Sequence, residues 1–230
     1  MTKKSGCYLI TIDGPSGAGK STVARMVAQQ LGYLYIDSGA MYRAVGLKAI
    51  QNHLSLDNTK DIVMLASRSR IELHPSHQGC RVFLDGVDVS EVIRTETVSQ
   101  AASRISSIPE VRRLMVQAQQ YLGRNGSVVM EGRDIGTKVF PDADLKIFLD
   151  ASETTRAQRR FDQNRRKKQS LSLEKTLQEI QQRDQRDRQR TDSPLVQAQD
   201  AIYLDTSKKD LNDVVEKILR LIQVVENNNT

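Results

Sequence analysis

The segment Gly14-Pro-Ser-Gly-Ala-Gly-Lys-Ser21 has the spacing G-x-x-x-x-G-K-[ST]. Glycines in this pattern let a loop point several backbone N–H groups at phosphate oxygens, and the N-terminus of a following helix adds positive potential. Lys20 can reach the β- and γ-phosphates of a nucleoside triphosphate, and Ser21 can bind the Mg²⁺ that bridges them. We therefore assign the binding of a nucleoside triphosphate, the expected ATP site, to Gly14, Pro15, Ser16, Gly17, Ala18, Gly19, Lys20, Ser21 and Thr22, with Ser21 as the expected metal ligand.

Three further segments carry arginines beside small or acidic residues. In 37–43, Asp-Ser-Gly-Ala-Met-Tyr-Arg, a Ser-Gly turn leads into a helix, which suits an anion, and Arg43 is a planar donor for phosphate. The run 131–134, Glu-Gly-Arg-Asp, follows a predicted strand, where ligands of open α/β sheets collect. The pattern Arg183-x-x-Arg-Asp-x-x-Arg190 places arginines on one helix face. Each segment alone also fits a helix cap, a surface ion pair or a solvated face.

Rival phosphate-binding classes leave these arginines unexplained. A GTPase would show Asn-Lys-x-Asp, which is absent. A motor or transport ATPase usually has four apolar residues followed by an acid, and 127–131 matches that pattern only in part, so Glu131 could hold a metal-bound water.

These motifs follow short apolar segments that alternate with helical patterns. Strands are predicted at 8–13, 33–37, 127–130, 145–149 and 201–204, and helices at 19–31, 40–50, 111–122, 154–169, 173–189 and 211–225. This alternation is typical of a parallel sheet covered on both faces. Segments 70–74 and 80–85 instead alternate apolar and polar residues, which predicts a small antiparallel subdomain inserted within about 58–100.

The composition describes a basic protein without a candidate membrane span. Its 230 residues include 34 Lys and Arg against 28 Asp and Glu, and the whole excess of +6 falls within 151–190. A basic segment favours polyanionic partners, but only 4% of residues are aromatic, so bases of single strands have few stacking partners. No apolar run approaches the roughly 18 residues of a membrane span, and the apolar run near the N-terminus is too short for a signal peptide. We expect a cytoplasmic protein.

Together the segments resemble the bacterial-type cytidylate kinases, which are P-loop nucleoside-monophosphate kinases. The matching segments occur in family order from about residue 10 to 207: 12–21, 37–43, 86–90, 93–95, 101–103, 111–112, 132–137, 139–143, 146–151 and 183–190. The resemblance implies a P-loop three-layer α/β fold with a five-stranded parallel sheet, an inserted monophosphate-binding domain with a small antiparallel sheet, and a helical lid. It places the core domain at 1–37, 108–152 and 191–230, the monophosphate-binding domain at 38–107, and the lid with a sugar-binding helix at 153–190.

The same resemblance implies roles for individual residues. The phosphate of the acceptor would contact Ser38, Tyr42, Arg43 and Arg133, joined by Arg190. The pyrimidine would contact Ser103, Arg112 and Asp134, and the sugar would contact Arg183 and Asp187. Lid arginines would be Arg156, Arg159, Arg160 and Arg186, and the catalytic set would be Lys20, Arg133 and Arg186. Glu131 stands where the family often has Asp.

The expected activity is reversible transfer of the γ-phosphoryl group of ATP·Mg²⁺ to CMP or dCMP, a step of pyrimidine nucleotide metabolism. The expected partners are these nucleotides, with no nucleic acid, no membrane and a monomeric state. One alternative is a P-loop kinase for another small acceptor, such as UMP, AMP or shikimate. The other is a nucleic-acid-binding protein that uses 151–190 as a basic arm, although the six acids within that segment would repel a phosphate backbone.

Overall fold

The centre of the molecule is a parallel sheet. The structure, a computed structural model, describes residues 7–76, 79–166 and 172–228. Strands β1 (Leu9–Asp13), β2 (Leu34–Asp37), β6 (Val128–Gly132), β7 (Leu145–Asp150) and β8 (Ile202–Asp205) pair in the order β2-β6-β1-β7-β8. All pairs are parallel, which confirms the predicted five-stranded sheet. The central position of β1 places the loop after it between the ends of β6 and β7.

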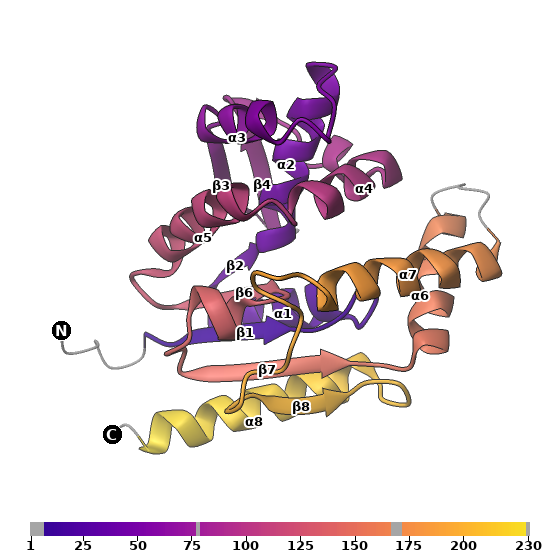
Figure 1. The fold of residues 1–230 in the computed structure, drawn as a ribbon. Coiled ribbons are helices and arrows are strands. Elements are labelled where there is room, and N and C mark those ends of the chain that lie inside the picture. The colour runs from indigo at the N-terminus through magenta and orange to yellow at the C-terminus, as the bar shows by residue number, and fades with distance from the viewer. Residues whose placement is uncertain (1–6, 77–78, 167–171, 229–230) are drawn as a thin grey trace.

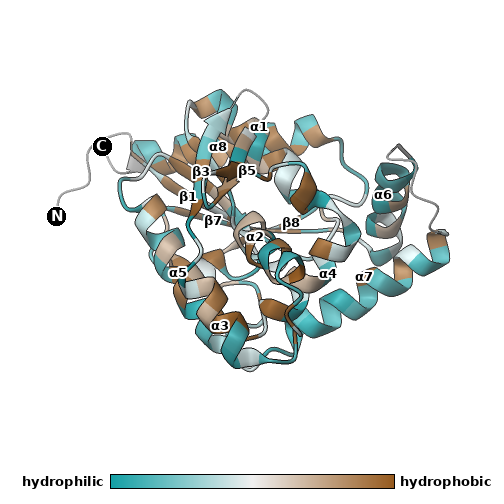
Figure 2. Cartoon of the chain, turned by 90° about the horizontal axis from the view of Figure 1, so that it is seen from above, coloured by the Kyte–Doolittle hydropathy of each residue, from teal (hydrophilic) through white to brown (hydrophobic). Residues whose placement is uncertain are grey.

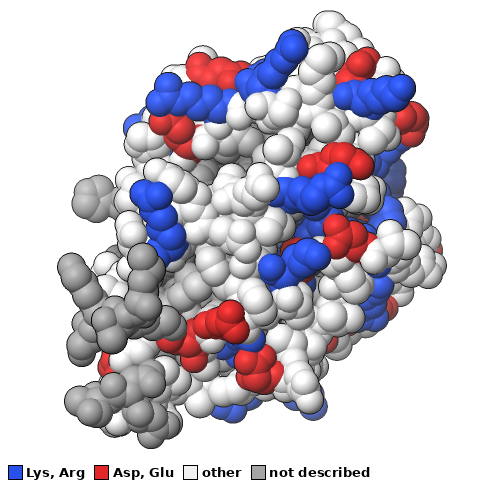
Figure 3. Space-filling model, turned by 60° about the vertical axis from the view of Figure 1, so that its left-hand side comes forward, with Lys and Arg blue, Asp and Glu red and all other residues white. Residues whose placement is uncertain are grey.

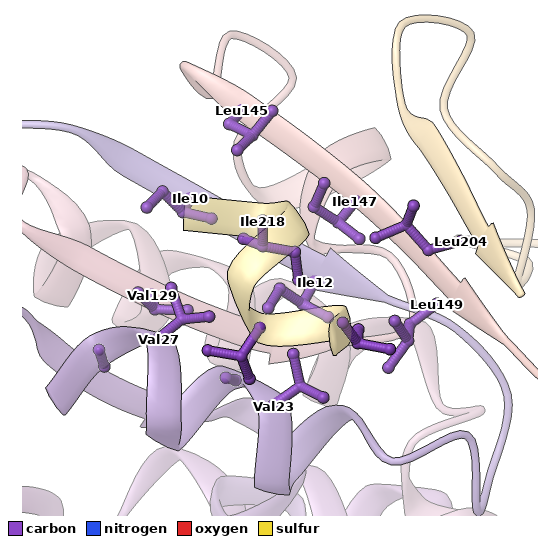
Figure 4. Packing of buried hydrophobic residues seen from close by; sticks show 14 of the residues in the cluster. Ile10, Ile12, Val23, Val27, Val129, Leu145, Ile147, Leu149, Leu204 and Ile218 are labelled. Atoms are coloured by element: carbon purple, nitrogen blue, oxygen red, sulfur yellow. The ribbon is translucent and has the colours of Figure 1, made fainter. Parts of the chain in front are cut away.

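Helices cover both faces of this sheet. On one face, α1 (Lys20–Leu31) and α8 (Leu211–Asn228) bury Val23, Val27 and Ile218 against Ile10 and Ile12 of β1 (Figure 4). On the other face lie α5 (Pro109–Gly123) and a single π-helical turn, η2 (Ile135–Val139). The β-branched and apolar strand residues are buried on both sides, as a parallel sheet requires.

A second unit is inserted between β2 and β6 and lies above the sheet in Figure 1. Its strands β3 (Ile71–Ser76), β4 (Gly79–Leu84) and β5 (Val87–Asp88) form the predicted antiparallel sheet. Around them are α2 (Ser38–Gln51), α3 (Thr59–Ser67), the 3-10 turn η1 (Val92–Arg94) and α4 (Glu96–Ile105). The sequence analysis did not predict α3 and α4, because each has only two or three turns and is too short for a clear helical repeat. Their stability comes from packing against α2 and α5.

Helices α6 (Glu153–Arg166) and α7 (Leu173–Arg188) pack against each other beside the sheet and are hydrophilic along most of their length (Figure 2). They carry the basic segment, of which Lys167 and Lys168 lie outside the described residues. Figure 3 shows the side of the molecule that faces left in Figure 1, away from α6 and α7, and there basic and acidic side chains are interspersed without a continuous basic patch. Within the ranges that the structure describes, no helix has the length and apolar character of a membrane span.

Candidate active site

The loop Gly14–Gly19 connects β1 to the first turn of α1. A Cβ on Gly14 would lie 1.9 Å from the carbonyl oxygen of Leu149 on β7, so only glycine lets the loop leave the sheet here. Gly19 precedes α1 with a φ of 95°, in the left-handed region that glycine tolerates. The loop therefore brings its backbone to the N-terminus of α1, where N–H groups and the helix dipole attract phosphate.

Lys20 is buried at the base of this loop, where its Nζ donates a hydrogen bond of 2.6 Å to the carbonyl oxygen of Pro15. Burial lowers the pKa of Lys20 to about 7, with a further lowering from the charge of Arg133. Glu131 acts in the opposite direction. Phosphate oxygens placed near Lys20 and Arg133 would offset this cation repulsion, so the site is electrostatically suited to a polyanion.

Oxygen atoms meet at the end of β6, beside the loop. Glu131 is buried, accepts a hydrogen bond of 2.8 Å from the Tyr35 hydroxyl and bonds Ser21. Burial raises the pKa of Glu131, and the neighbouring Asp37 raises it further. Among residues 7–76, 79–166 and 172–228, no group of three or more His, Cys, Asp or Glu side chains could hold a metal. The Ser21 hydroxyl and one carboxylate fit Mg²⁺, which commonly takes few protein ligands and keeps water and phosphate oxygens.

A cleft of about 490 Å³ extends from this loop to the inserted unit. It is lined by every residue that was expected to contact the acceptor: Ser38, Tyr42, Arg43, Ser103, Arg112, Arg133, Asp134, Arg183, Asp187 and Arg190. Of the expected ATP-binding residues, Ser16, Gly17, Gly19, Lys20, Ser21 and Thr22 line it. Gly14, Pro15 and Ala18 support the loop from outside the cleft lining.

At one end of the cleft, Arg112 of α5 forms an ion pair with Asp134, which follows β6. Both side chains are buried, and the Arg112 guanidinium lies 5.6 Å from the ring centroid of Tyr42. The Ser103 hydroxyl lines the same region. Asp134 immediately precedes η2, whose first two N–H groups donate to Asp13 at 2.9 and 2.7 Å, so β1 holds this turn in place.

Further charged pairs line the cleft. Asp187 accepts hydrogen bonds from Arg133 Nε, at 2.9 Å, and from Arg190 Nη2. Asp37 is 2.5 Å from Arg43 Nη2; burial acts to raise the pKa of Asp37, but Arg43 brings it below its usual value. The arginines are thus held in place by carboxylates from neighbouring segments and keep other N–H groups for a ligand.

Several buried polar atoms in the cleft have no hydrogen-bond partner. They are Arg43 Nε, Ser103 Oγ, Arg112 Nε and Arg183 Nε, four of the seven such side-chain atoms found among the described residues. Burial lowers the pKa of Arg183 to about 10, assisted by the charge of Arg133. Since leaving a buried donor unpaired is costly, their concentration in one cleft points to a polar, anionic ligand.

The expected lid arginines are in three kinds of position. Arg159 and Arg160 of α6 line the cleft; Arg160 pairs with Glu96 of α4 at 2.9 Å. Arg156 does not line it: this side chain is 1% exposed and pairs with Asp184. Arg186 is exposed outside the cleft, and its Nε donates to the carbonyl oxygen of Gln182. The structure therefore brings Arg159 and Arg160, but neither Arg156 nor Arg186, to the cleft.

The sequence analysis did not identify two residues near the cleft, Asp184 and Ser106. Asp184 accepts a hydrogen bond of 3.2 Å from the Ser16 amide, while its partner Arg156 donates one of 2.9 Å to the Ser16 carbonyl oxygen. The two side chains therefore hold in place the loop Gly14–Gly19, which is called the phosphate loop below. Ser106 lines the cleft at the end of α4. Their partners are distant in sequence, and the spacing of residues near them offered no signal.

Comparison with known proteins agrees with this geometry. Residues 10–224 match the family model described as cytidylate kinase. A cytidylate kinase of Lysinibacillus sphaericus (strain C3-41) is 48% identical over 214 residues, covering 93% of this chain and 96% of the relative. One of Bacillus subtilis (strain 168) is 45% identical with the same coverage. A gluconokinase structure from Sinorhizobium meliloti 1021 shares the fold, with a TM-score of 0.51, 16% identity and 97% coverage of each chain.

Proposed function

The chain belongs to the cytidylate kinase family, and we propose that it transfers the γ-phosphoryl group of ATP to CMP or dCMP, giving CDP or dCDP. As a member of this family it is a nucleoside-monophosphate kinase. The observation that carries the choice of acceptor is the buried Arg112–Asp134 pair, which shares one cleft with the phosphate loop and Lys20.

The donor would bind along the loop Gly14–Gly19, with Lys20 on its β- and γ-phosphates. We propose Mg²⁺ as the cofactor, held by the Ser21 hydroxyl, with Glu131 orienting a bound water. When bound, Mg²⁺ would neutralise part of the charge on the donor phosphates. Arg159 and Arg160 lie on the lid side, where they can approach the same phosphates.

The base of the acceptor would be recognised by side chains that act either as hydrogen-bond donors or as acceptors. Cytosine has an exocyclic amine, which donates, next to a ring nitrogen and a carbonyl, which accept. Asp134 and Ser103 can accept from the amine, and Arg112 can donate to the two acceptors. Uracil presents a carbonyl in place of the amine, so a carboxylate at Asp134 would face another acceptor. This mismatch favours CMP over UMP.

The transfer itself requires little proton chemistry. The attacking oxygen belongs to an anionic phosphate, so positioning in line with the donor and neutralising charge account for the catalysis. Lys20 and Arg133 lie within one cleft and supply these charges in cis. We leave Arg186 out of the catalytic set, because its side chain is exposed outside the cleft.

The arrangement of the basic segment supports nucleotides as the polyanions. Arg156 and Arg190 are directed inward and paired with Asp184 and Asp187 instead of forming a basic surface. We therefore propose that the protein acts as a monomer in the cytoplasm on free nucleotides, without nucleic-acid or membrane partners. We also retain the division into a core domain, a monophosphate-binding domain at 38–107 and a lid unit at 153–190.

The test is an assay of ADP release with CMP, dCMP, UMP, AMP, dTMP and shikimate as acceptors. We expect CMP and dCMP to give the highest kcat/KM. A higher value with UMP, AMP or shikimate would replace the proposed acceptor by that compound. Tight, strongly salt-dependent binding of DNA or RNA without acceptor-dependent ATP turnover would instead support the nucleic-acid-binding alternative.

A further inference from the structure

Ser106 caps the C-terminus of α4 at the boundary between the inserted unit and the core. Its side chain is buried and lines the cleft. The hydroxyl accepts a hydrogen bond of 2.9 Å from Arg190 Nη2 and donates one of 3.0 Å to the carbonyl oxygen of Ser103. The carbonyl oxygen of Ser106 accepts a bond of 2.9 Å from Arg112 Nη1. One residue thus contacts two arginines from different parts of the chain.

These bonds connect the two ends of the acceptor site. On one side, Arg112 forms its ion pair with Asp134, which we propose to recognise the base. On the other side, Arg190 pairs with Asp187, and Asp187 also pairs with Arg133. We propose that Asp187 contacts the sugar and Arg133 the phosphate. Ser106 is where the two sets meet.

The chemistry of a hydroxyl explains why this position can orient Arg190. A serine hydroxyl has one proton, which is directed to the Ser103 carbonyl, so its lone pairs remain for Arg190. Arg190 Nη2 is then held by two acceptors, Asp187 near the end of α7, three residues before Arg190, and Ser106 on the inserted unit. Two acceptors from different elements restrict the guanidinium more than either alone, and donating its proton strengthens the hydroxyl as an acceptor.

We propose that Ser106 is a positioning residue that fixes Arg190 against the acceptor phosphate and links that contact to recognition of the base. The inference rests on the proposed function, because it assumes that CMP or dCMP occupies this cleft. The loss of the hydroxyl is expected to weaken acceptor binding and to leave ATP binding unchanged, since Ser106 contacts no residue of the phosphate loop in the bonds described above.

The experiment compares Ser106→Ala with Ser107→Ala as the matched control. Ser107 is the adjacent serine, is exposed, and donates its hydroxyl to the Arg104 carbonyl. For Ser106→Ala we expect KM and the calorimetric Kd for CMP to rise about tenfold, the size of losing one hydrogen bond to a charged group. KM for ATP should stay near the wild-type value, Tm should fall by no more than several degrees for the lost buried bonds, and Ser107→Ala should match wild type in all four measurements.

A double-mutant cycle with Arg190→Ala tests whether Ser106 acts through this arginine. In the Arg190→Ala background, Ser106→Ala should add less than a twofold change in the Kd for CMP. Full additivity, an unchanged Kd for CMP in the single variant, or an equal rise in KM for ATP would each overturn the proposal. If wild type shows no CMP-dependent turnover, the proposed function fails; if only the variant behaves like wild type, only this inference fails.

Discussion

On the proposed donor side of the cleft, the loop and its lysine belong to the single segment Gly14–Thr22, joined by Arg159 and Arg160 of α6, whereas the proposed acceptor side takes its side chains from segments between Ser38 and Arg190. The donor side relies on backbone N–H groups and one lysine at a helix N-terminus. The acceptor side relies on guanidinium groups that carboxylates from other segments hold in place. One side is local in sequence, and the other forms only when distant elements pack together.

The electrostatics of the two sides differ in the same way. Burial and the charge of Arg133 lower the pKa of Lys20 to about 7. Buried Arg112, in contrast, has Asp134 as a direct partner. Removing Lys20 should therefore raise the stability of the fold and strongly lower the rate of phosphoryl transfer. Breaking the Arg112–Asp134 pair should lower both stability and activity. This difference can be tested by substitution.

The largest effect is expected for Lys20→Met. Loss of a donor that stabilises transferring charge typically lowers kcat about 10²- to 10³-fold. The Kd for CMP should change little, since Lys20 lies at the phosphate loop and not among the residues near Asp134. The measurements are kcat by ADP release and the Kd for CMP by calorimetry; near-normal kcat would remove Lys20 from the catalytic set.

The stability of this variant supplies the matching control. A lysine whose folded pKa is about 7, below its unfolded value of 10.5, costs stability fully below pH 7. That cost disappears as the pH rises through the interval from 7 to 10.5. We therefore expect Lys20→Met to have a higher Tm than wild type at pH 6.5, and the difference to shrink by pH 9.5. A Tm difference that grows with pH would contradict the lowered pKa of Lys20.

A smaller but broader effect is expected for Asp134→Asn. The substitution keeps the shape but leaves buried Arg112 without an anionic partner, and breaking such a pair typically costs about 3–5 kcal/mol. Tm should fall, and the ratio of kcat/KM for CMP to that for UMP should fall about tenfold or more, because the carboxylate no longer selects the amine. Asp200→Asn, which breaks the pair with Lys146 outside the cleft, should leave this ratio unchanged.

The same contrast explains how far the sequence could be interpreted. Lys20 and the five parallel strands were predicted because both signals are local: a spaced motif and short apolar runs before turns. The membership of Arg112 and Arg190 in one cleft required the resemblance to a family. Arg156 was expected to contact the phosphates, yet its side chain is buried and pairs with Asp184. This partner is 28 positions away, and no local pattern indicates it.

Ser106 shows the same limit more sharply. By its neighbours it is an ordinary serine before a proline-initiated helix, and its bond to Arg190 spans 84 positions. Its contact depends on how the inserted unit packs against the end of α7, which is a property of the folded chain. Local physics thus predicts the donor side, and tertiary packing determines the acceptor side.

The smallest effect is expected where α6 meets α4 of the inserted unit. Arg160 lines the cleft but pairs with Glu96 at 2.9 Å, and both side chains are partly exposed. Glu96→Gln removes a carboxylate that competes with phosphate for Arg160, so KM for ATP should fall by up to about twofold at low salt, within the roughly 1 kcal/mol of an exposed pair. At 0.5 M salt, where screening is strong, the difference should vanish. The matched control is Glu110→Gln, whose pair with Arg113 on α5 lies outside the cleft and should not alter KM. A rise in KM for ATP would mean that Glu96 holds Arg160 ready for the donor instead of withholding it, and would assign the acceptor side a direct part in donor binding.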